Sequence, residues 1–147
     1  MGKKFRFDEI EQYVRKRQPG LYEISTLSGV NLKVGISVNL LNRLKAHRAS
    51  RNSGLKLKPG GSWDNPSDVL SKKSILAKHL FFDRAISSSY NLRTESGRRE
   101  FLQQECVISV VLTKTKADAR EIEKKREVSG DFRYVGKVVV KKSGSDC

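Results

Sequence analysis

Residues 20–47 read GLYEISTLSGVNLKVGISVNLLNRLKAH, and this stretch decides the fold of the chain. Its first part is typical of two short strands, at residues 20–24 and 31–36, joined by a turn. Gly29 favours that turn, because glycine takes a positive φ at little steric cost. Ser37 is a plausible N-cap for a helix running from about Val38 to His47. The stretch therefore predicts a hairpin that leads directly into a helix.

The spacing of Leu40, Arg43, Leu44 and His47 gives this helix one recognisable face, since residues at i, i+3, i+4 and i+7 line up. Two leucines on that face predict that it turns towards the core. Arg43 and His47 are then expected at the interior edge of the protein. A satisfied polar pair at the rim of the core is one reading of them, and a functional pair is the other.

The two tripeptides of the hairpin resemble a known signature. Gly20-Leu21-Tyr22, ten further residues and Lys33-Val34-Gly35 are similar to the paired motifs of the GIY-YIG endonuclease family. In that family a helix follows, with an arginine eight residues after the second glycine, and here that residue is Arg43. Many members carry a histidine one turn later, which matches His47. The likeness covers residues 20–47 well and the rest of the chain only by layout.

This resemblance implies an α+β fold: a small, mainly antiparallel sheet of about three central strands plus a C-terminal strand, flanked by helices. It also implies a divalent-metal-dependent endonuclease that hydrolyses phosphodiester bonds in DNA. The domain is expected to span residues 1–142, with a basic insertion at 48–104 and a frayed tail at 143–147. The implied catalytic residues are Tyr22, Lys33, Arg43, His47 and Glu123.

The expected metal is Mg²⁺ or Mn²⁺, and a hard cation of this kind needs an anionic oxygen ligand. The predicted helix after residue 115 offers three glutamates, and helical periodicity distinguishes them. Glu123 shares a face with Ala119 and Ile122, while Glu121 lies opposite and Glu127 to one flank. Glu123 is therefore the predicted metal ligand, which agrees with the family pattern. A structural ion pair with Arg43 or Lys33 is the alternative.

Two departures from the family pattern affect the predicted chemistry. Lys33 stands where the second motif usually has tyrosine, which leaves the general base open between Tyr22 and Lys33. With an ordinary pKa of about 10, Tyr22 is a poor base unless nearby cations lower that pKa, and Lys33, Arg43 and the metal are the candidates to do so. An asparagine that several members use near the metal is missing, and Ser129 or Asp131 are candidates to replace it.

The net charge of +14 indicates a polyanionic partner, usually nucleic acid, although a basic but inert surface has the same composition. Residues 48–66 read as a long loop in which the cations and Trp63 would bind a backbone and stack on a base. A loop pinned to the core by Trp63 is the alternative. The predicted nucleic-acid-binding residues are Arg48, Arg51, Lys56, Lys58, Trp63, Arg98 and Arg99.

Further helices are predicted within residues 3–18, at 67–85 and at 94–104 with Thr94 as N-cap, and the last follows Thr115. The apolar run at 106–112 predicts a central strand, and 133–142 a final strand. No apolar run approaches the ~20 residues of a membrane span, and no secretory leader is visible. Two cysteines without metal-ligand spacing favour a reducing, cytoplasmic setting.

Two further readings compete with a DNA endonuclease. One is a nucleic-acid-binding module on the same scaffold that no longer cuts, and the other is a basic protein that contacts protein or ribosomal RNA. The substrate is left open between DNA and RNA. A short chain without a separate reading domain also suits a homodimer that cuts both strands. An inward glutamate favours the endonuclease, because an acid facing phosphate repels it unless a cation lies between them.

Overall fold

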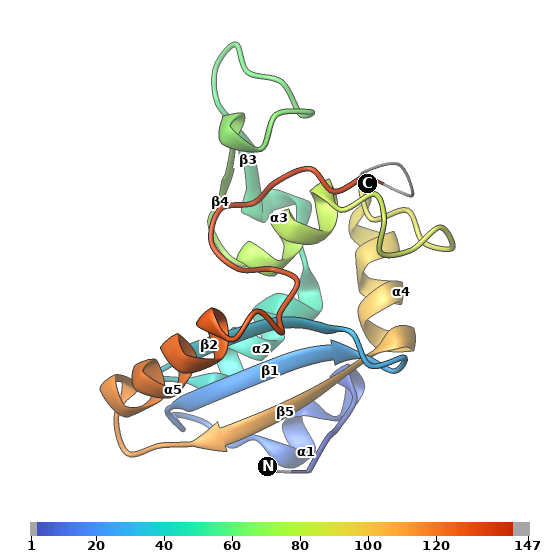
Figure 1. Ribbon diagram of the computed structural model, residues 1–147. Helices are drawn as coiled ribbons and strands as arrows, with labels where there is room; N and C mark the ends of the chain where they lie inside the picture. The colour runs from blue at the N-terminus through green and yellow to red at the C-terminus, as the bar shows by residue number, and fades with distance from the viewer. Residues whose placement is uncertain (1–2, 143–147) are drawn as a thin grey trace. The chain divides into compact units, whose positions relative to one another are not determined.

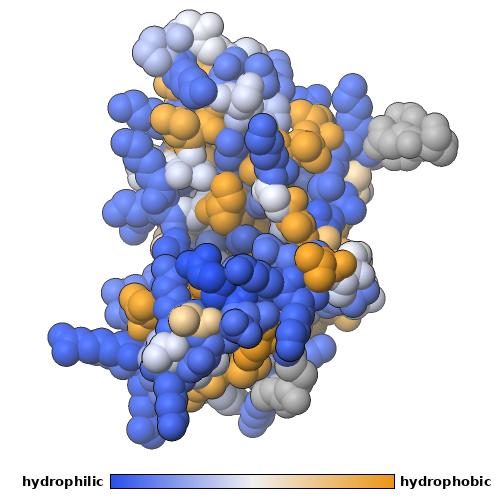
Figure 2. Space-filling model, turned by 60° about the vertical axis from the view of Figure 1, so that its left-hand side comes forward, coloured by the Kyte–Doolittle hydropathy of each residue, from blue (hydrophilic) through white to orange (hydrophobic). Residues whose placement is uncertain are grey.

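The computed structural model describes residues 3–142, which divide into two compact units. The first comprises residues 3–45 and 102–135, and the second comprises residues 46–101 and 136–142. The architecture is α+β, with one three-stranded antiparallel sheet, a separate two-stranded hairpin and five α-helices among the described residues. None of these helices is both long enough and apolar enough to cross a membrane. Hydrophilic side chains cover most of the face drawn in Figure 2.

The sheet of the first unit has the strand order β2-β1-β5, with β1 at Gly20–Thr26, β2 at Asn31–Ser37 and β5 at Cys106–Leu112 (Figure 1). Both pairings are antiparallel, and β1 is the central strand because it pairs with both of the others. Gly29 has a φ of 99° in the turn between β1 and β2, as expected of a glycine there. The predicted hairpin is confirmed, and so is a strand at 106–112. That strand lies at an edge of the sheet and not at its centre as predicted, because it pairs with β1 on one side and, among the described residues, has only a single bridge, to Phe5, on the other.

Helix α5, Lys116–Val128, packs on one face of this sheet (Figure 1). Leu21, Val34 and Ala119 form the buried centre of the contact, with Ile122 packed against them. The helix begins where predicted, because the Thr115 hydroxyl accepts a hydrogen bond from the Asp118 backbone N–H at 3.1 Å. One turn of apolar spacing on α5 therefore fixes which of its side chains face the sheet.

Helix α2, Leu40–Ala49, follows β2 after a short connection. Its first turn is capped by Asn39, whose side-chain oxygen accepts from the Asn42 N–H at 3.2 Å. Ser37 instead accepts from the Asn39 N–H, which closes a turn before the helix. The predicted N-cap was therefore two residues early. Leu40 and Leu44 are fully buried, as their spacing predicted.

The N-terminal segment forms less helix than expected. A 3₁₀ turn at Phe7–Glu9 leads into α1, Ile10–Tyr13, and regular helix ends before the basic run at 15–17. Phe5 forms an antiparallel bridge with Ile108 of β5, through backbone hydrogen bonds of 2.7 and 2.9 Å. The backbone of this segment is thus partly held by the sheet edge rather than by a helix.

The predicted C-terminal strand at 133–142 is wrong. Arg133 and Tyr134 donate backbone hydrogen bonds to Asn31 and Leu32, along the edge of β2, but no strand forms. Gly136, with a φ of 71°, then breaks the extended path. The only later pairing among the described residues is a single bridge between Lys141 and Asp83 in the second unit. The predicted tail at 143–147 lies outside the described residues.

The second unit contains a short hairpin and a helix. Strands β3, Leu55–Leu57, and β4, Val69–Ser71, pair antiparallel, and a 3₁₀ turn at Pro66–Asp68 precedes β4. Helix α3 spans only Ile75–Phe82, with the Ser74 hydroxyl as its N-cap. The predicted helix at 67–85 was therefore too long. The core of this unit includes Leu55, Val69, Phe81, Phe82 and Val138.

Helix α4, Glu95–Glu105, begins in the second unit and ends in the first. The Thr94 hydroxyl accepts a hydrogen bond from the Gly97 N–H at 3.0 Å, which confirms the predicted N-cap. At the other end, the Arg6 guanidinium donates to the carbonyl oxygens of Gln103 and Gln104 at 2.7 and 2.9 Å. These carbonyls belong to the last helical turn, where a cation is favourable.

Candidate active site

Tyr22 lies in the central strand, directly opposite Gly35 of β2. Its side chain is 2% exposed, and its ring extends across the backbone of Gly35, where a Cβ atom would lie 2.7 Å from Tyr22 Cε2 and closer still to the hydroxyl. Burial raises the pKa of Tyr22; Arg43 opposes this shift and Glu123 adds to it. Among the protein's own cations, Arg43 therefore does not lower this pKa below its ordinary value, because desolvation outweighs it.

Lys33 precedes Gly35 by two residues on β2 and lies opposite Ile24 of β1. Side chains two residues apart on a strand share a face, so Lys33, Gly35 and the Tyr22 ring lie on the same side of the sheet. Burial lowers the pKa of the Lys33 ammonium, while Glu127 and Glu123 raise it. Arg43 adds to the lowering. The half-buried Lys33 therefore interacts electrostatically with the two carboxylates of α5 and with Arg43 of α2.

Arg43 does not face the core as the helical spacing predicted. The residue is exposed, whereas Leu40 and Leu44 of the same helix are fully buried. Its charge nevertheless acts on both Tyr22 and Lys33, since it lowers both pKa values. A guanidinium in this position stays accessible to a ligand while bordering the buried phenol.

Glu123 is half-buried on α5, and Glu121 is exposed, as periodicity predicted. Burial raises the pKa of Glu123, and so does the carboxylate of Glu127. Lys33, Arg120 and Lys116 lower it. Glu127 is a residue that the sequence reasoning missed: it is also half-buried, one helical turn after Glu123. The i, i+4 spacing of the two acids was the signal that could have found it.

The first unit therefore brings together a phenol, an ammonium, a guanidinium and two carboxylates, and each charged group alters the pKa of at least one other member. These groups are Tyr22, Lys33, Arg43, Glu123 and Glu127. They come from β1, β2 and α2, which follow one another in the chain, and from the distant helix α5. No cluster of three or more His, Cys, Asp or Glu side chains suited to a metal occurs among residues 3–142.

The donor set at Glu123 and Glu127 fits Mg²⁺ chemically. Mg²⁺ prefers oxygen ligands and is commonly held by one or two carboxylates, with waters and substrate phosphates completing the shell. The Glu127 carboxylate raises the pKa of Glu123, and this repulsion is what a shared cation would relieve. Ser129, considered as a replacement for the missing asparagine, donates its hydroxyl to the Arg126 carbonyl at 2.6 Å.

His47 belongs to the second unit, and it is 1% exposed. Its Nδ1 atom lies 2.6 Å from the hydroxyl oxygen of Ser74, the residue that caps α3. This contact links the end of α2 to the start of α3. The geometry gives His47 a role in packing, and its catalytic role stays a prediction.

Several of the predicted nucleic-acid-binding side chains are accessible. Arg51, Lys56 and Lys58 are exposed, Arg48 is half-buried, and Trp63 is 41% exposed. Arg99 is half-buried: it donates to the Ala49 carbonyl at 2.6 Å and pairs with Glu95 at 2.8 Å. All of these residues belong to the second unit.

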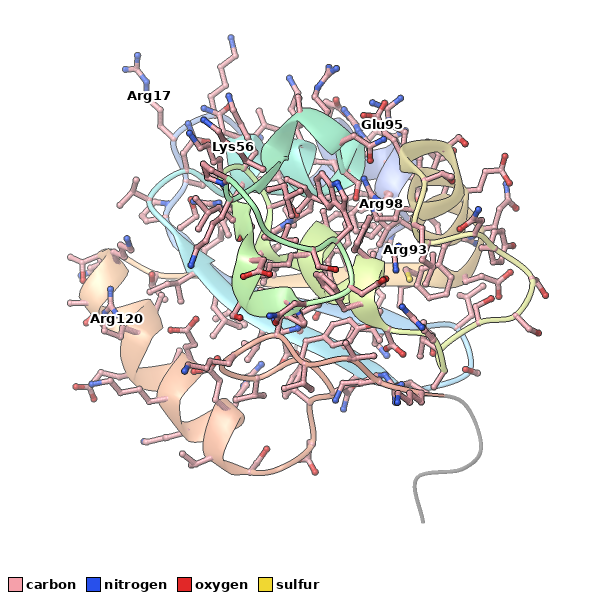
Figure 3. All side chains as sticks on the ribbon, turned by 90° about the horizontal axis from the view of Figure 1, so that it is seen from above. Arg17, Lys56, Arg93, Glu95, Arg98 and Arg120 are labelled. Atoms are coloured by element: carbon pink, nitrogen blue, oxygen red, sulfur yellow. The ribbon has the colours of Figure 1, made fainter. Side chains whose placement is uncertain are left out.

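Arg98 corrects the sequence prediction. It is the largest fully buried side chain of the described residues, and it donates hydrogen bonds to Ser50, Leu92 and Asn52. Figure 3 shows Arg98 within the second unit, whereas Arg17 extends away from the protein. Burial lowers the pKa of Arg98 to about 10. Its guanidinium holds the segment after α2 in place and does not face a phosphate.

Comparison of this chain with protein-family models, with curated proteins and with solved structures gives no significant match.

Proposed function

We propose that this protein is a divalent-metal-dependent endonuclease that hydrolyses phosphodiester bonds in DNA. One observation carries the proposal: Tyr22, Lys33, Arg43 and Glu123, predicted as catalytic residues, share one electrostatic neighbourhood in the first unit. A protein with a net charge of +14 also attracts a polyanionic substrate over long range.

Arg43 is suited to the phosphate that is attacked. Its guanidinium is always charged, and its planar fork matches two phosphate oxygens. Because Arg43 is exposed, a phosphate can reach it from solvent. Charge that develops on the phosphate oxygens in the transition state would be stabilised there, a contribution of roughly 3–4 kcal/mol at comparable sites.

Lys33 is a better candidate for the general base than Tyr22. A base must lose its proton near the working pH, and burial moves the pKa of Lys33 down and that of Tyr22 up. The neutral Tyr22 hydroxyl would then orient the attacking water by hydrogen bonding. Lys33, which stands where the similar family usually has tyrosine, would thus be the general base.

Glu123, together with Glu127, would hold the divalent cation. When bound there, the cation would supply charge neutralisation for the phosphate and stabilisation for the leaving oxygen. The two carboxylates lie on one face of α5, which is held against the sheet by Ala119 and Ile122. This packing would keep the ligand pair in place without a bound substrate.

A non-cleaving nucleic-acid-binding module is the second candidate, and the position of Lys33 favours it. Its ammonium opposes the rise in the pKa of Glu123 that burial causes, and both carboxylates oppose the lowering of its own pKa. A lysine in that relationship neutralises acids in the same way that a metal ion would. A scaffold that had lost its metal would keep the lysine beside the two carboxylates.

Nicking of supercoiled plasmid separates the two candidates. Hydrolysis requires nicking with Mg²⁺, none with EDTA, and a loss of about 10²-fold or more in both Arg43→Lys and Glu123→Gln. Glu121→Gln is the matched control, because Glu121 is exposed on the same helix, and it should nick like wild type. If wild-type protein binds plasmid but does not nick it, the endonuclease is excluded and the non-cleaving binding module is favoured.

A further inference from the structure

The second unit contains a cavity of about 310 Å³ that the catalytic proposal does not use. It is lined by Asn52, Leu55, Trp63, Phe81 and Arg93. Leu55 and Phe81 are buried, at 6% and 8% exposure, and provide its apolar base. Trp63 and Arg93 stand at its accessible side. The volume lies at the lower end of small-ligand sites, which span about 300–1,000 Å³.

Trp63 is held in place and remains accessible. Its ring packs on Phe81 with centroids 5.8 Å apart and planes tilted by 50°, yet 41% of the residue is exposed. The Arg93 guanidinium lies 4.2 Å from the centre of the Phe81 ring and contacts the Trp63 carbonyl oxygen at 3.5 Å. An exposed aromatic surface that is already ordered loses little entropy when it binds a planar ligand.

The charges around the cavity favour an anionic ligand. The Asp64 carboxylate, next to Trp63, is paired with both Arg93 and Arg84, at 3.3 and 3.4 Å. Two arginines and one aspartate leave a net positive charge beside the aromatic ring. Figure 3 shows Arg93 and Arg98 on the same part of the second unit.

Asn52 supplies a directed polar group at the cavity. Its side-chain oxygen accepts a hydrogen bond from the buried Arg98, and its backbone N–H donates to Glu95 at 2.8 Å. The amide is therefore oriented with its oxygen towards Arg98, so its NH₂ group is the part available to a ligand acceptor. Nucleobases combine a planar face with such acceptors at the ring edge.

We infer that this cavity binds a single unpaired nucleobase, stacked on Trp63 beside Arg93, with its flanking phosphate drawn by the net positive charge. The inference rests on the proposed nucleic-acid substrate and specifies its class: DNA with a base outside the helical stack. Within a paired duplex both faces of each base are covered, so a base reaches Trp63 only after leaving the stack. A bulged or mismatched base leaves it at the lowest cost.

Three fluorescein-labelled DNAs test this inference with the full-length chain in EDTA. The first is a duplex with one bulged thymine, the second carries an abasic residue at the bulge, and the third is fully paired. Fluorescence anisotropy should show binding about tenfold tighter to the bulged thymine than to the abasic duplex. Because Trp63 is the only tryptophan, its emission should be quenched by the bulged thymine alone.

Trp63→Leu should abolish the preference for the bulged thymine and leave the affinity for the abasic duplex unchanged, while Trp63→Phe should retain most of it. Leu70→Ala, a change at an exposed residue of the same hairpin, is the matched control and should keep the preference. Equal affinity for bulged and abasic DNA, or a preference that survives in Trp63→Leu, would overturn the base pocket alone. A chain that binds none of the three DNAs would overturn the nucleic-acid substrate as well.

Discussion

The ring of Tyr22 occupies the space above Gly35 that a side chain would otherwise fill. The two residues face one another across β1 and β2, and a Cβ atom at Gly35 would overlap the Tyr22 hydroxyl and the ring carbon that carries it. The absence of a side chain at Gly35 therefore leaves room for the phenol to lie across β2, on the side of the sheet that Lys33 shares. The register of β1 and β2, together with the glycine at position 35, therefore positions the Tyr22 hydroxyl, the proposed water-orienting group.

Gly35→Ala should move the Tyr22 ring and reduce both stability and nicking. Overpacking of this kind costs about 1–3 kcal/mol, which corresponds to roughly 2–4 °C in Tm per kcal/mol for a chain of this size. Gly54→Ala is the control, since a Cβ atom there meets Lys73 at an ordinary 3.4 Å. Thermal unfolding followed by circular dichroism measures both variants. Equal Tm values for the two would contradict the close approach of Tyr22 to Gly35.

The pH dependence of nicking should identify Lys33 as the base. Because burial lowers its pKa below 10.5, deprotonated Lys33 accumulates as the pH rises, and the rate should rise with it before reaching a plateau below that value. Lys33→Arg cannot lose its proton, so the rising limb should disappear with a loss of at least about 10²-fold.

Tyr22→Phe provides the comparison for this profile. It should slow nicking but leave the position of the rising limb unchanged, because the raised pKa of Tyr22 keeps its hydroxyl neutral over the measured range. A limb that vanishes in Tyr22→Phe and persists in Lys33→Arg would reverse the two roles. Single-turnover rates with saturating plasmid keep substrate binding out of the measurement.

Glu123→Gln should be at least as stable as wild type at neutral pH. Burial and Glu127 raise the pKa of Glu123, so the folded state binds its proton more tightly than the unfolded chain. Stability from this group is therefore present at low pH and is lost as the pH rises through the folded-state pKa, above the ordinary 4.5. The glutamine removes that loss.

Thermal unfolding in EDTA at pH 4 and pH 7.5 measures this effect, and the advantage of Glu123→Gln should appear at the higher pH. Added Mg²⁺ should then raise the Tm of wild type and leave that of Glu123→Gln unchanged, since only a ligand that binds the folded state stabilises it. A variant that is less stable than wild type at pH 7.5 in EDTA would show Glu123 to be a structural ion-pair partner.

Local signals in the sequence predicted the parts of the fold that local interactions determine. Thr94 and Thr115 were identified as helix caps and accept the expected hydrogen bonds. Gly29 was identified as the turn residue, and its φ is positive. Helical periodicity separated half-buried Glu123 from exposed Glu121. Each of these outcomes depends on neighbours within about four residues, which the sequence displays directly.

The features that the sequence did not reveal depend on distant partners. Arg43 shares a helical face with buried leucines and is nevertheless exposed. The spacing of residues along a helix does not show where the packed part of that face ends. The raised pKa of Tyr22 follows from burial among elements far apart in the chain. Strands β3 and β4 have three residues each, too few to show a period of two.

Arg98 provides the sharpest test of the second unit, because sequence and structure assign it different roles. Arg98→Met should remove the donors that satisfy the backbone carbonyls of Ser50 and Leu92, leaving buried acceptors without partners. The expected loss is about 1–3 kcal/mol for each buried acceptor that is left without a partner. Arg51→Met is the control, and this exposed residue should change the free energy of unfolding by less than about 0.5 kcal/mol. Urea unfolding measures both. If Arg98 contacted phosphate instead, Arg98→Met would unfold like wild type, and the salt dependence of its DNA affinity would weaken by about one counterion.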